Sequence, residues 1–306
     1  MATCTATRSG WIVASSRGLV SLGDTSDALD GLAVTALHPS HDAMWAMVGG
    51  RHLYRVEGRR RTLVASLDDV VATCVVEHRG DVFVGGADAG LWRLAGSTLR
   101  VVESFLDAPT RDGWDTPWGG PPDVYSMASR GDELYVSVHV GGILRSSDRG
   151  RTWKPTVDLE VDVHQVVTDG DGGLWAATGM RGLAHSTDRG ETWAFHSRGL
   201  HAGYLLAVAA TSDAVLVGAS SGPFADDGAL YRFADGAFER CTDLPADIGG
   251  AISPRHIVAD GDDAVVALPN GDIHVSADSG RSWTLVAEGL PGVSGVALHS
   301  VDPPLR

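Results

Sequence analysis

Short stretches in which apolar or small residues alternate with polar ones recur along the whole chain. The clearest set has four such stretches in succession, at Val163 to Thr168, Leu174 to Thr178, Gly182 to Ser186 and Thr192 to His196. Alternation with a period of two is typical of half-buried β-strands, and the Asp- and Gly-rich segments between the stretches are typical of turns. No convincing amphipathic helix interrupts this pattern, so the sequence predicts an all-β protein.

An octapeptide of the form S-x-D-x-G-x-[TS]-W occurs at 146–153, 186–193 and 276–283. The second copy begins 40 residues after the first, and the third begins 90 residues later, which is two periods of about 45 residues. Each residue type suits a β-hairpin: the Asp carboxylate accepts backbone N–H bonds, Gly adopts a positive φ, and the Trp ring fills space between sheets. The residues expected to have this structural role are Asp148, Gly150, Trp153, Asp188, Gly190, Trp193, Asp278, Gly280 and Trp283.

These octapeptides resemble the Asp boxes of the BNR-repeat β-propellers, a set that includes sialidases, sortilin-type receptors, two-domain xyloglucanases and the photosystem II assembly factor. The resemblance implies that each box lies on the turn between the third and fourth strands of a blade, on the outer rim and away from the ligand face. It implies a fold and no particular chemistry. The arginine triad of sialidases is not carried over, because no Arg-Ile-Pro segment occurs near the N-terminus.

Repeat units laid along the chain predict one domain over 1–306, a seven-bladed β-propeller with Asp-box repeats. Six blades are expected at about 31–67, 69–106, 122–157, 162–198, 203–243 and 254–289. The seventh is expected to combine a first strand at 293–303 with second and third strands within 10–22, so that both chain ends close the ring. A pair of β-sandwiches is the rival fold, and a period of roughly 40 residues argues against it.

Composition narrows the functions that this fold would serve. The formal net charge of −15 disfavours nucleic-acid binding, because a polyanion is repelled, and the one dense basic run, Arg59-Arg60-Arg61, suits a solvated turn. Three cysteines without a CxxC pair argue against a disulfide framework or a zinc knuckle. The N-terminal apolar run is too short for a signal peptide or a membrane span, so we expect a cytoplasmic protein that engages no nucleic acid and no membrane.

Departures from the repeat gather on the face that carries the loops before each first strand and between each second and third strand. The longest insertions are Asp107 to Pro122 and Ser220 to Gly228. Insertions on one face of a rigid scaffold are the usual place for a binding site. Tryptophans in such insertions are expected to be exposed anchors for a protein, small-molecule or carbohydrate ligand. The predicted ligand-binding residues are Trp114, Asp115, Trp118, Asp123, Tyr125, Tyr204 and Arg255.

Histidines from successive blades are also expected on this face, namely His139, His164, His201 and His256. A ring of imidazoles that converged near the axis would bind a transition metal. The alternative is that each His bonds a loop carbonyl, since the chain has no metal-ligand spacing motif. No cofactor is predicted apart from a transition metal at this His cluster.

Three functions stay open. The preferred one is a non-catalytic binding or scaffold propeller that recognises a protein or small ligand through its insertion-rich face. The second is an enzyme, either a metal-dependent lyase that uses the histidines or a glycosidase-like hydrolase with two carboxylates from among Asp69, Asp115, Asp123 and Asp162. The third is a sugar-binding module whose aromatic loops stack on pyranose rings. The chain has no P-loop and no H-E-x-x-H motif, which favours the first function.

Overall fold

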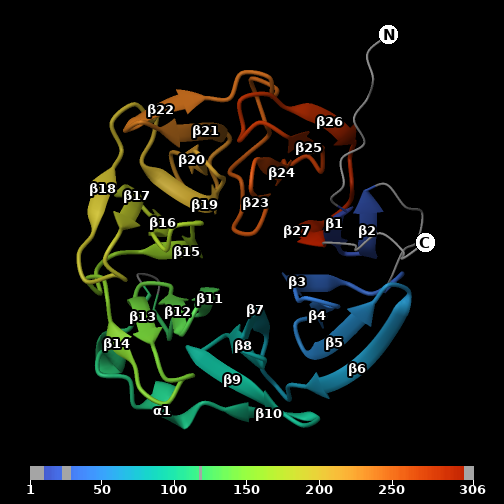
Figure 1. Ribbon diagram of the computed structural model, residues 1–306, viewed down its shortest axis with the longest axis vertical. Coiled ribbons are helices and arrows are strands. Elements are labelled where there is room, and N and C mark those ends of the chain that lie inside the picture. The colour runs from blue at the N-terminus through green and yellow to red at the C-terminus, as the bar shows by residue number, and fades with distance from the viewer. Residues whose placement is uncertain (1–9, 23–28, 117–118, 300–306) are drawn as a thin grey trace.

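The computed structural model describes residues 10–22, 29–116 and 119–299. In these ranges the strands form seven sheets that lie around a central axis like the blades of a propeller (Figure 1). Six sheets have four strands, each paired antiparallel with the next, and the seventh has three. The prediction of an all-β, seven-bladed propeller is confirmed.

The strand bounds follow the chain order. Blade 1 consists of β3 (Val34–Pro39), β4 (Met44–Val48), β5 (His52–Glu57) and β6 (Arg60–Ser66). Blade 2 consists of β7 (Ala72–His78), β8 (Asp81–Gly86), β9 (Gly90–Ala95) and β10 (Thr98–Val101). Blade 3 consists of β11 (Val124–Arg130), β12 (Glu133–Val138), β13 (Gly142–Ser146) and β14 (Lys154–Pro155).

Blades 4 to 6 repeat this arrangement. Blade 4 consists of β15 (Val163–Thr168), β16 (Leu174–Thr178), β17 (Gly182–Ser186) and β18 (Ala194–His196). Blade 5 consists of β19 (Tyr204–Ala210), β20 (Val215–Ser220), β21 (Ala229–Ala234) and β22 (Ala237–Arg240). Blade 6 consists of β23 (Ile257–Asp260), β24 (Asp263–Ala267), β25 (Ile273–Ser276) and β26 (Thr284–Ala287). The first strand of each blade lies nearest the axis and the fourth lies on the outer rim (Figure 1).

Both ends of the chain build blade 7. The strand nearest the axis is β27 (Val293–His299), and it pairs antiparallel with β1 (Gly10–Ser15), which in turn pairs with β2 (Gly18–Leu22). The predicted closure of the ring is therefore confirmed. The end of the expected first strand, 300–303, lies outside the described residues.

The core lies between the blades. Second strands are sandwiched by neighbouring sheets, and every residue of β4, β16 and β20 is buried. Burial on both faces explains why β4 reads as the continuous apolar run Met-Trp-Ala-Met-Val and not as an alternating one. The outer strands are more exposed and carry the polar residues.

The three octapeptides form the turns between third and fourth strands, at the outer rim. In the second copy, Asp188 Oδ1 accepts a hydrogen bond from the Thr192 N–H at 2.9 Å, and its Oδ2 accepts one from the Thr192 hydroxyl at 2.6 Å. The Ser186 hydroxyl donates to the same carboxylate at 2.8 Å. Asp148 and Asp278 accept equivalent bonds in their own turns. The carboxylate thus holds each turn closed, as its residue types predict.

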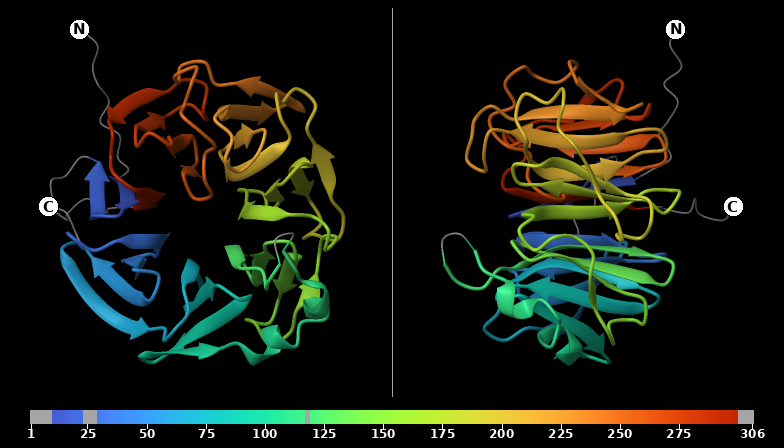
Figure 2. Two further views of the ribbon diagram at one scale, coloured as in Figure 1. Left: turned by 180° about the vertical axis from the view of Figure 1, so that it is seen from behind. Right: turned by 90° about the vertical axis from the view of Figure 1, so that its left-hand side faces the viewer.

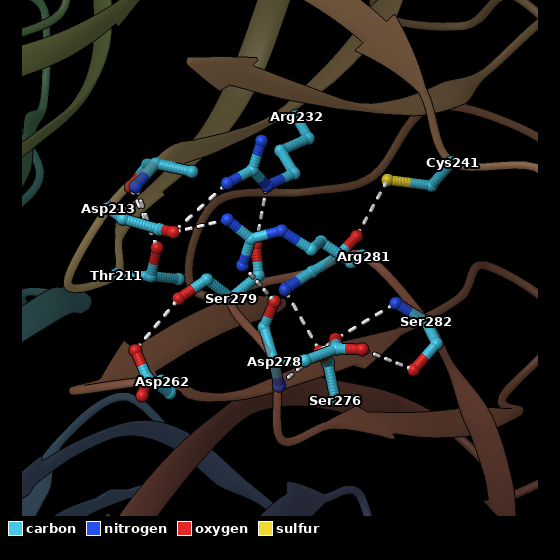
Figure 3. A network of polar contacts seen from close by, with 12 residues as sticks. Thr211, Asp213, Arg232, Cys241, Asp262, Ser276, Asp278, Ser279, Arg281 and Ser282 are labelled. Atoms are coloured by element: carbon cyan, nitrogen blue, oxygen red, sulfur yellow. Dashed lines mark hydrogen bonds and ion pairs between the residues drawn. The ribbon is translucent and has the colours of Figure 1, made fainter.

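The third octapeptide also ties blade 6 to blade 5 (Figure 3). Arg232 of β21 is 9% exposed, and its Nε donates to the carbonyl oxygen of Ser279 at 2.9 Å. Its guanidinium also pairs with Asp213 at 2.9 Å, and Arg281 pairs with the same carboxylate. These contacts give the octapeptide a structural function on the rim, far from the axis.

The longest insertion follows β10 and contains a short helix, α1 (Glu103–Leu106), and one 3-10 turn (Arg111–Gly113). It lies beside blade 3 and extends from one face of the ring (Figure 2). No helix within the described ranges is both long and apolar enough to cross a membrane.

Candidate functional site

The end of the central channel where the first strands begin is here called the mouth. In blades 1 to 5 the pairing of first and second strands shifts by one residue near this end. Such a β-bulge leaves one residue out of the ladder and re-aims its side chain. The bulged residues are Thr35, Thr73, Tyr125, His164 and Leu206.

The bulge at His164 turns its side chain towards the next blade. Its Nδ1 lies 2.6 Å from the carbonyl oxygen of Leu205 on the first strand of the next blade. The hydroxyl of Thr73 donates in the same way to the carbonyl oxygen of Val124, one blade onward. Because a carbonyl only accepts, the Nδ1 of His164 carries the proton. Nδ1 of His164 therefore joins blades 4 and 5, and Nε2 of the same ring faces the mouth.

Three side chains come together there. Asp162, just before β15, has Oδ1 3.1 Å from Nε2 of His139 and Oδ2 3.2 Å from Nε2 of His164. The contact between Asp162 Oδ1 and His139 Nε2 has the length of a hydrogen bond but not its alignment. The His164 side chain is 1% exposed, that of His139 is 14% exposed and that of Asp162 is 27% exposed. The Asp162 side chain is thus the most exposed of the three, although its Oδ1 atom is buried.

Two tyrosines complete this group. Tyr125 stacks on His139 with ring centroids 5.0 Å apart, and Tyr204 places its hydroxyl 3.2 Å from Nε2 of His164. Burial, reinforced by the charge of Asp162, raises the pKa of Tyr204 to about 12, so its hydroxyl stays protonated at neutral pH. We call Tyr125, His139, Asp162, His164 and Tyr204 the mouth cluster.

Two carboxylates at the mouth have opposite pKa shifts. Burial alone would raise the pKa of Asp162, but the close contacts of its carboxylate with His139 and His164 outweigh burial and hold that pKa well below its usual range. For Asp123, just before β11, burial raises the pKa and the nearby His139 only partly opposes the shift. Asp162 is therefore an anion at neutral pH.

Arg255 forms hydrogen bonds to two other blades. It precedes β23 in blade 6, and its backbone N–H donates to Oε1 of Gln165 in blade 4 at 3.2 Å. Its guanidinium donates to the carbonyl oxygen of Tyr125 in blade 3 at 3.3 Å. Arg255 therefore joins three blades through the channel, as well as lying at the predicted face.

The structure corrects the expectation that Trp114 is exposed. Its side chain is 8% exposed, its ring centroid lies 5.4 Å from that of Phe105, and its indole N–H donates to Thr110 at 3.2 Å. The insertion has folded back onto the core of blades 2 and 3. Trp118, the other predicted anchor, lies outside the described residues. Asp115 and Asp69 are exposed on their loops and do not belong to the mouth cluster.

Of the four histidines for which convergence was one alternative, only His139 and His164 share a group of close ligand atoms in the described part of the chain. His201 instead bonds the hydroxyl of Tyr231 at 2.9 Å, and its Nε2 lies 3.7 Å from Asp227. His256 is 9% exposed, and its Nδ1 has no hydrogen-bond partner among the residues that the structure describes.

Sequence patterns missed two residues beside the cluster. Gly179 lies next to Asp162. A Cβ at position 179 would overlap the Oδ2 atom of the Asp162 carboxylate. Met180, in the β16–β17 turn, is 76% exposed. A large apolar residue in a turn that otherwise holds Gly and Arg is the signal that would have found it. Phe224, within the predicted Ser220–Gly228 insertion, is 99% exposed.

A G-x-S-x-G pentapeptide, the pattern of a hydrolase nucleophile turn, occupies 218–222. Ser220 ends β20, is 1% exposed and donates its hydroxyl to the carbonyl oxygen of Gly222 at 2.9 Å. A loop and not a helix follows it. This serine therefore has the environment of a structural residue and not that of an exposed nucleophile.

No protein-family model matches the chain, and no curated protein matches it by sequence. Among solved structures it resembles YCF48 from Cyanidioschyzon merolae, with 13% identity, a TM-score of 0.58 and coverage of 87% of this chain and 94% of that one. A structure of YCF48 bound to D1 peptide gives 12% identity, a TM-score of 0.59 and coverage of 88% and 93%. These likenesses show the fold alone.

The GH74 enzyme of Niastella koreensis gives a TM-score of 0.64 at 14% identity. The match covers 93% of this chain but 53% of the enzyme, so this chain spans about half of that protein. Similar solved structures thus include a propeller bound to a peptide and a GH74 enzyme, and a function for this chain has to be argued from its own residues.

Proposed function

We propose that this chain is a binding propeller that docks a segment of another protein on its mouth face, over blades 4 and 5. The observation that carries the proposal is the exposure of two large apolar side chains, Phe224 at 99% and Met180 at 76%. Other large apolar side chains that reach the surface of the described residues are between 40% and 53% exposed. Exposed aromatic and methionine side chains are typical anchors at protein interfaces.

The two anchors lie on one continuous surface. Both belong to loops between second and third strands, which share the mouth face, and the blades are neighbours (Figure 1). The Met180 turn packs against Gly203, whose carbonyl oxygen accepts the Gly182 N–H at 3.0 Å. Two residues before Gly203, His201 faces Asp227 of the Phe224 loop. The connection between β18 and β19 therefore bridges the two loops.

The surroundings of Phe224 favour a basic partner segment. Asp226 and Asp227 are exposed two and three residues after it, and the accessible carboxylate of Asp162 lies beside the Met180 turn. Complementary charge steers association and fixes register, so the fitting segment combines an apolar anchor with Lys or Arg. The net charge of −15 acts in the same direction at longer range.

Two further observations support this proposal. A propeller of similar fold has been solved with a bound peptide, so the fold is compatible with peptide docking. The octapeptide turns have the hydrogen bonds expected of Asp boxes, and we propose on that basis that the chain is related to the Asp-box propellers. In that set the boxes lie on the rim, which leaves the mouth face for ligands.

The test is selection from a displayed random-peptide library against the wild-type protein. We expect enrichment of peptides that combine Phe, Trp or Leu with Lys or Arg. Substitutions Phe224→Ser and Met180→Ser should each weaken binding of an enriched peptide by at least about tenfold, as for interface anchors. Leu63→Ser, at a 52% exposed leucine of β6, is the matched control and should bind as the wild type does. Enriched peptides that ignore both anchor substitutions would refute the proposal.

A second candidate function is glycoside hydrolysis, favoured by the opposite pKa shifts of Asp123 and Asp162. A general acid with a raised pKa and a second carboxylate that stays ionised are what this reaction requires. Chromogenic aryl glycosides test it directly. Turnover that disappears in both Asp123→Asn and Asp162→Asn would establish the hydrolase, and no turnover across the common pyranosides would exclude these substrates.

A further inference from the structure

We propose that His139, Asp162 and His164 bind one divalent transition-metal ion at the mouth and leave a coordination position open. Their ligand atoms all lie within 4.8 Å of one another. Three ligands of the types imidazole, carboxylate and imidazole are the set that protein sites use for zinc or non-haem iron when an exogenous ligand must also bind. This proposal does not depend on peptide docking.

The distances already approach those of a coordination shell. A tetrahedral ion with bonds of about 2.0–2.2 Å holds its ligand atoms about 3.3 Å apart. Asp162 Oδ1 is 3.1 Å from Nε2 of His139, and Oδ2 is 3.2 Å from Nε2 of His164. The remaining separations are at most 4.8 Å, so binding would draw the ligand atoms closer together, and His139 is on a loop after β12.

The ring of His164 is held with one nitrogen turned to the cluster. Its Nδ1 lies 2.6 Å from the carbonyl oxygen of Leu205, so in the neutral ring Nε2 has the lone pair that a metal ion would accept. Nε2 lies 3.2 Å from Oδ2 of Asp162, and Oδ1 of the same carboxylate is buried without a hydrogen-bond partner among the described residues. A metal ion between these atoms would bind both side chains and His139 as well.

The surroundings have the features that support metal ligands. Histidine ligands usually donate their other ring N–H to a carbonyl or carboxylate, which fixes the ring, and His164 does so to Leu205. The absence of a side chain at Gly179 makes room for the carboxylate of Asp162. The Tyr204 hydroxyl, 3.2 Å from Nε2 of His164, can donate to a water or ligand at the open position.

Zinc titration of chelator-treated protein, followed by calorimetry at pH 7.5, tests the proposal, and Co²⁺ absorption bands report the geometry. We expect one ion per chain, bound more tightly than about 10 μM, and no comparable binding of Mg²⁺, which prefers oxygen ligands. Asp162→Asn and His139→Ala should each weaken Zn²⁺ binding by more than about 100-fold, because even changes outside the ligand shell cost about 10- to 100-fold.

Two variants separate a metal site from general damage. Gly179→Ala would place a Cβ against the carboxylate of Asp162 and close to Cε1 of His164, so it should weaken Zn²⁺ binding at least about tenfold while the melting temperature stays close to that of the wild type. His201→Ala removes an accessible histidine of the same face from outside the cluster and should leave Zn²⁺ binding unchanged. Because Phe224→Ser changes neither a metal ligand nor a neighbour of one, it should weaken peptide docking and leave Zn²⁺ binding unchanged, so the two proposals can fail separately.

The contradicting results are equally specific. If the wild type binds no Zn²⁺ and no Co²⁺ below about 100 μM, His139, Asp162 and His164 do not form a metal site. If Asp162→Asn binds Zn²⁺ as tightly as the wild type does, or His201→Ala loses it, the ion lies elsewhere. Each of these outcomes overturns the proposed site.

Discussion

The guanidinium of Arg255 donates from blade 6 to the carbonyl oxygen of Tyr125 in blade 3, at 3.3 Å. These blades are not neighbours in the ring, so the bond spans the central channel (Figure 1). The carbonyl oxygen of Arg255 also accepts the N–H of Val296 in blade 7 at 2.9 Å. One residue thus braces the channel directly behind the mouth cluster.

Removal of this brace should be measurable as lost stability. Arg255→Met keeps the length of the side chain but removes the charged donor, and a hydrogen bond from a charged group contributes about 1.5–3 kcal/mol. We expect the free energy of unfolding in urea to fall by that amount. Arg93→Met, at an exposed arginine of β9, is the control and should cost less than about 0.5 kcal/mol. Equal losses of unfolding free energy in Arg255→Met and Arg93→Met would show that the hydrogen bond of Arg255 adds no stability.

The octapeptide turns should weaken in acid. Hydrogen bonds from the side chain and backbone of Thr192 lower the pKa of Asp188 from 3.8 to about 2. Because the folded pKa is below the unfolded one, the carboxylate stabilises the protein above about pH 4 and loses that effect as the pH falls towards 2. Asp188→Ala should therefore lower the melting temperature at pH 7, with a gap that narrows between pH 4 and 2.

The control for this acid effect is Asp243→Ala, which removes an exposed aspartate from the connection after β22. It should change the melting temperature little at either pH. A gap between wild type and Asp188→Ala that stayed constant from pH 7 to pH 2 would mean that the ionised carboxylate does not hold the turn.

A second pH dependence arises at His256. Burial, with a contribution from the charge of Arg255, lowers the pKa of His256 to about 4. The unfolded chain takes up this proton below about pH 6.5 and the folded chain does not, so stability falls as the pH drops from 6.5 to 4. The full effect is about 3 kcal/mol, at 1.36 kcal/mol per pKa unit. Urea unfolding of His256→Gln should show a flatter pH profile than that of the wild type, and an unchanged profile would contradict the lowered pKa of His256.

The shared blade 7 can be tested by a crosslink between the chain ends. Ile12 of β1 and Ala297 of β27 are paired residues, so cysteines at both positions should form a disulfide. The oxidised Ile12→Cys/Ala297→Cys protein should migrate differently from the reduced form and melt at a higher temperature, because the crosslink closes nearly the whole chain into a loop. The single variant Ile12→Cys should show neither change. Failure to crosslink under oxidation would contradict the ring closure.

The repeat determined what the sequence could predict. The octapeptides and the alternating stretches depend on local turn chemistry and on a period of two, and both are local properties of the chain. The two leftover segments at the chain ends could then be assigned to one blade, since an open sheet edge is costly. The rim positions of Asp148, Asp188 and Asp278 were instead what the resemblance to the Asp-box propellers implied, and their turn hydrogen bonds agree with it.

The side-chain positions at the mouth were less predictable, because they depend on contacts that do not follow the sequence repeat. Trp114 lies in an insertion without a repeat, and its packing against Phe105 gives no local pattern. His164 and His256 both lie at the start of a first strand, but only His164 occupies a β-bulge that turns its ring towards Asp162. A difference of one residue in register thus separates a cluster member from a buried structural histidine.

The central claim is that the mouth face over blades 4 and 5 is the binding surface. Hydrogen–deuterium exchange of the wild-type protein, with and without a peptide enriched by selection, measures this directly. We predict slower exchange confined to 139–142, 178–182, 200–204 and 220–228. Protection at the rim turns 146–153, 186–193 and 276–283, with unchanged exchange at the mouth, would contradict the account.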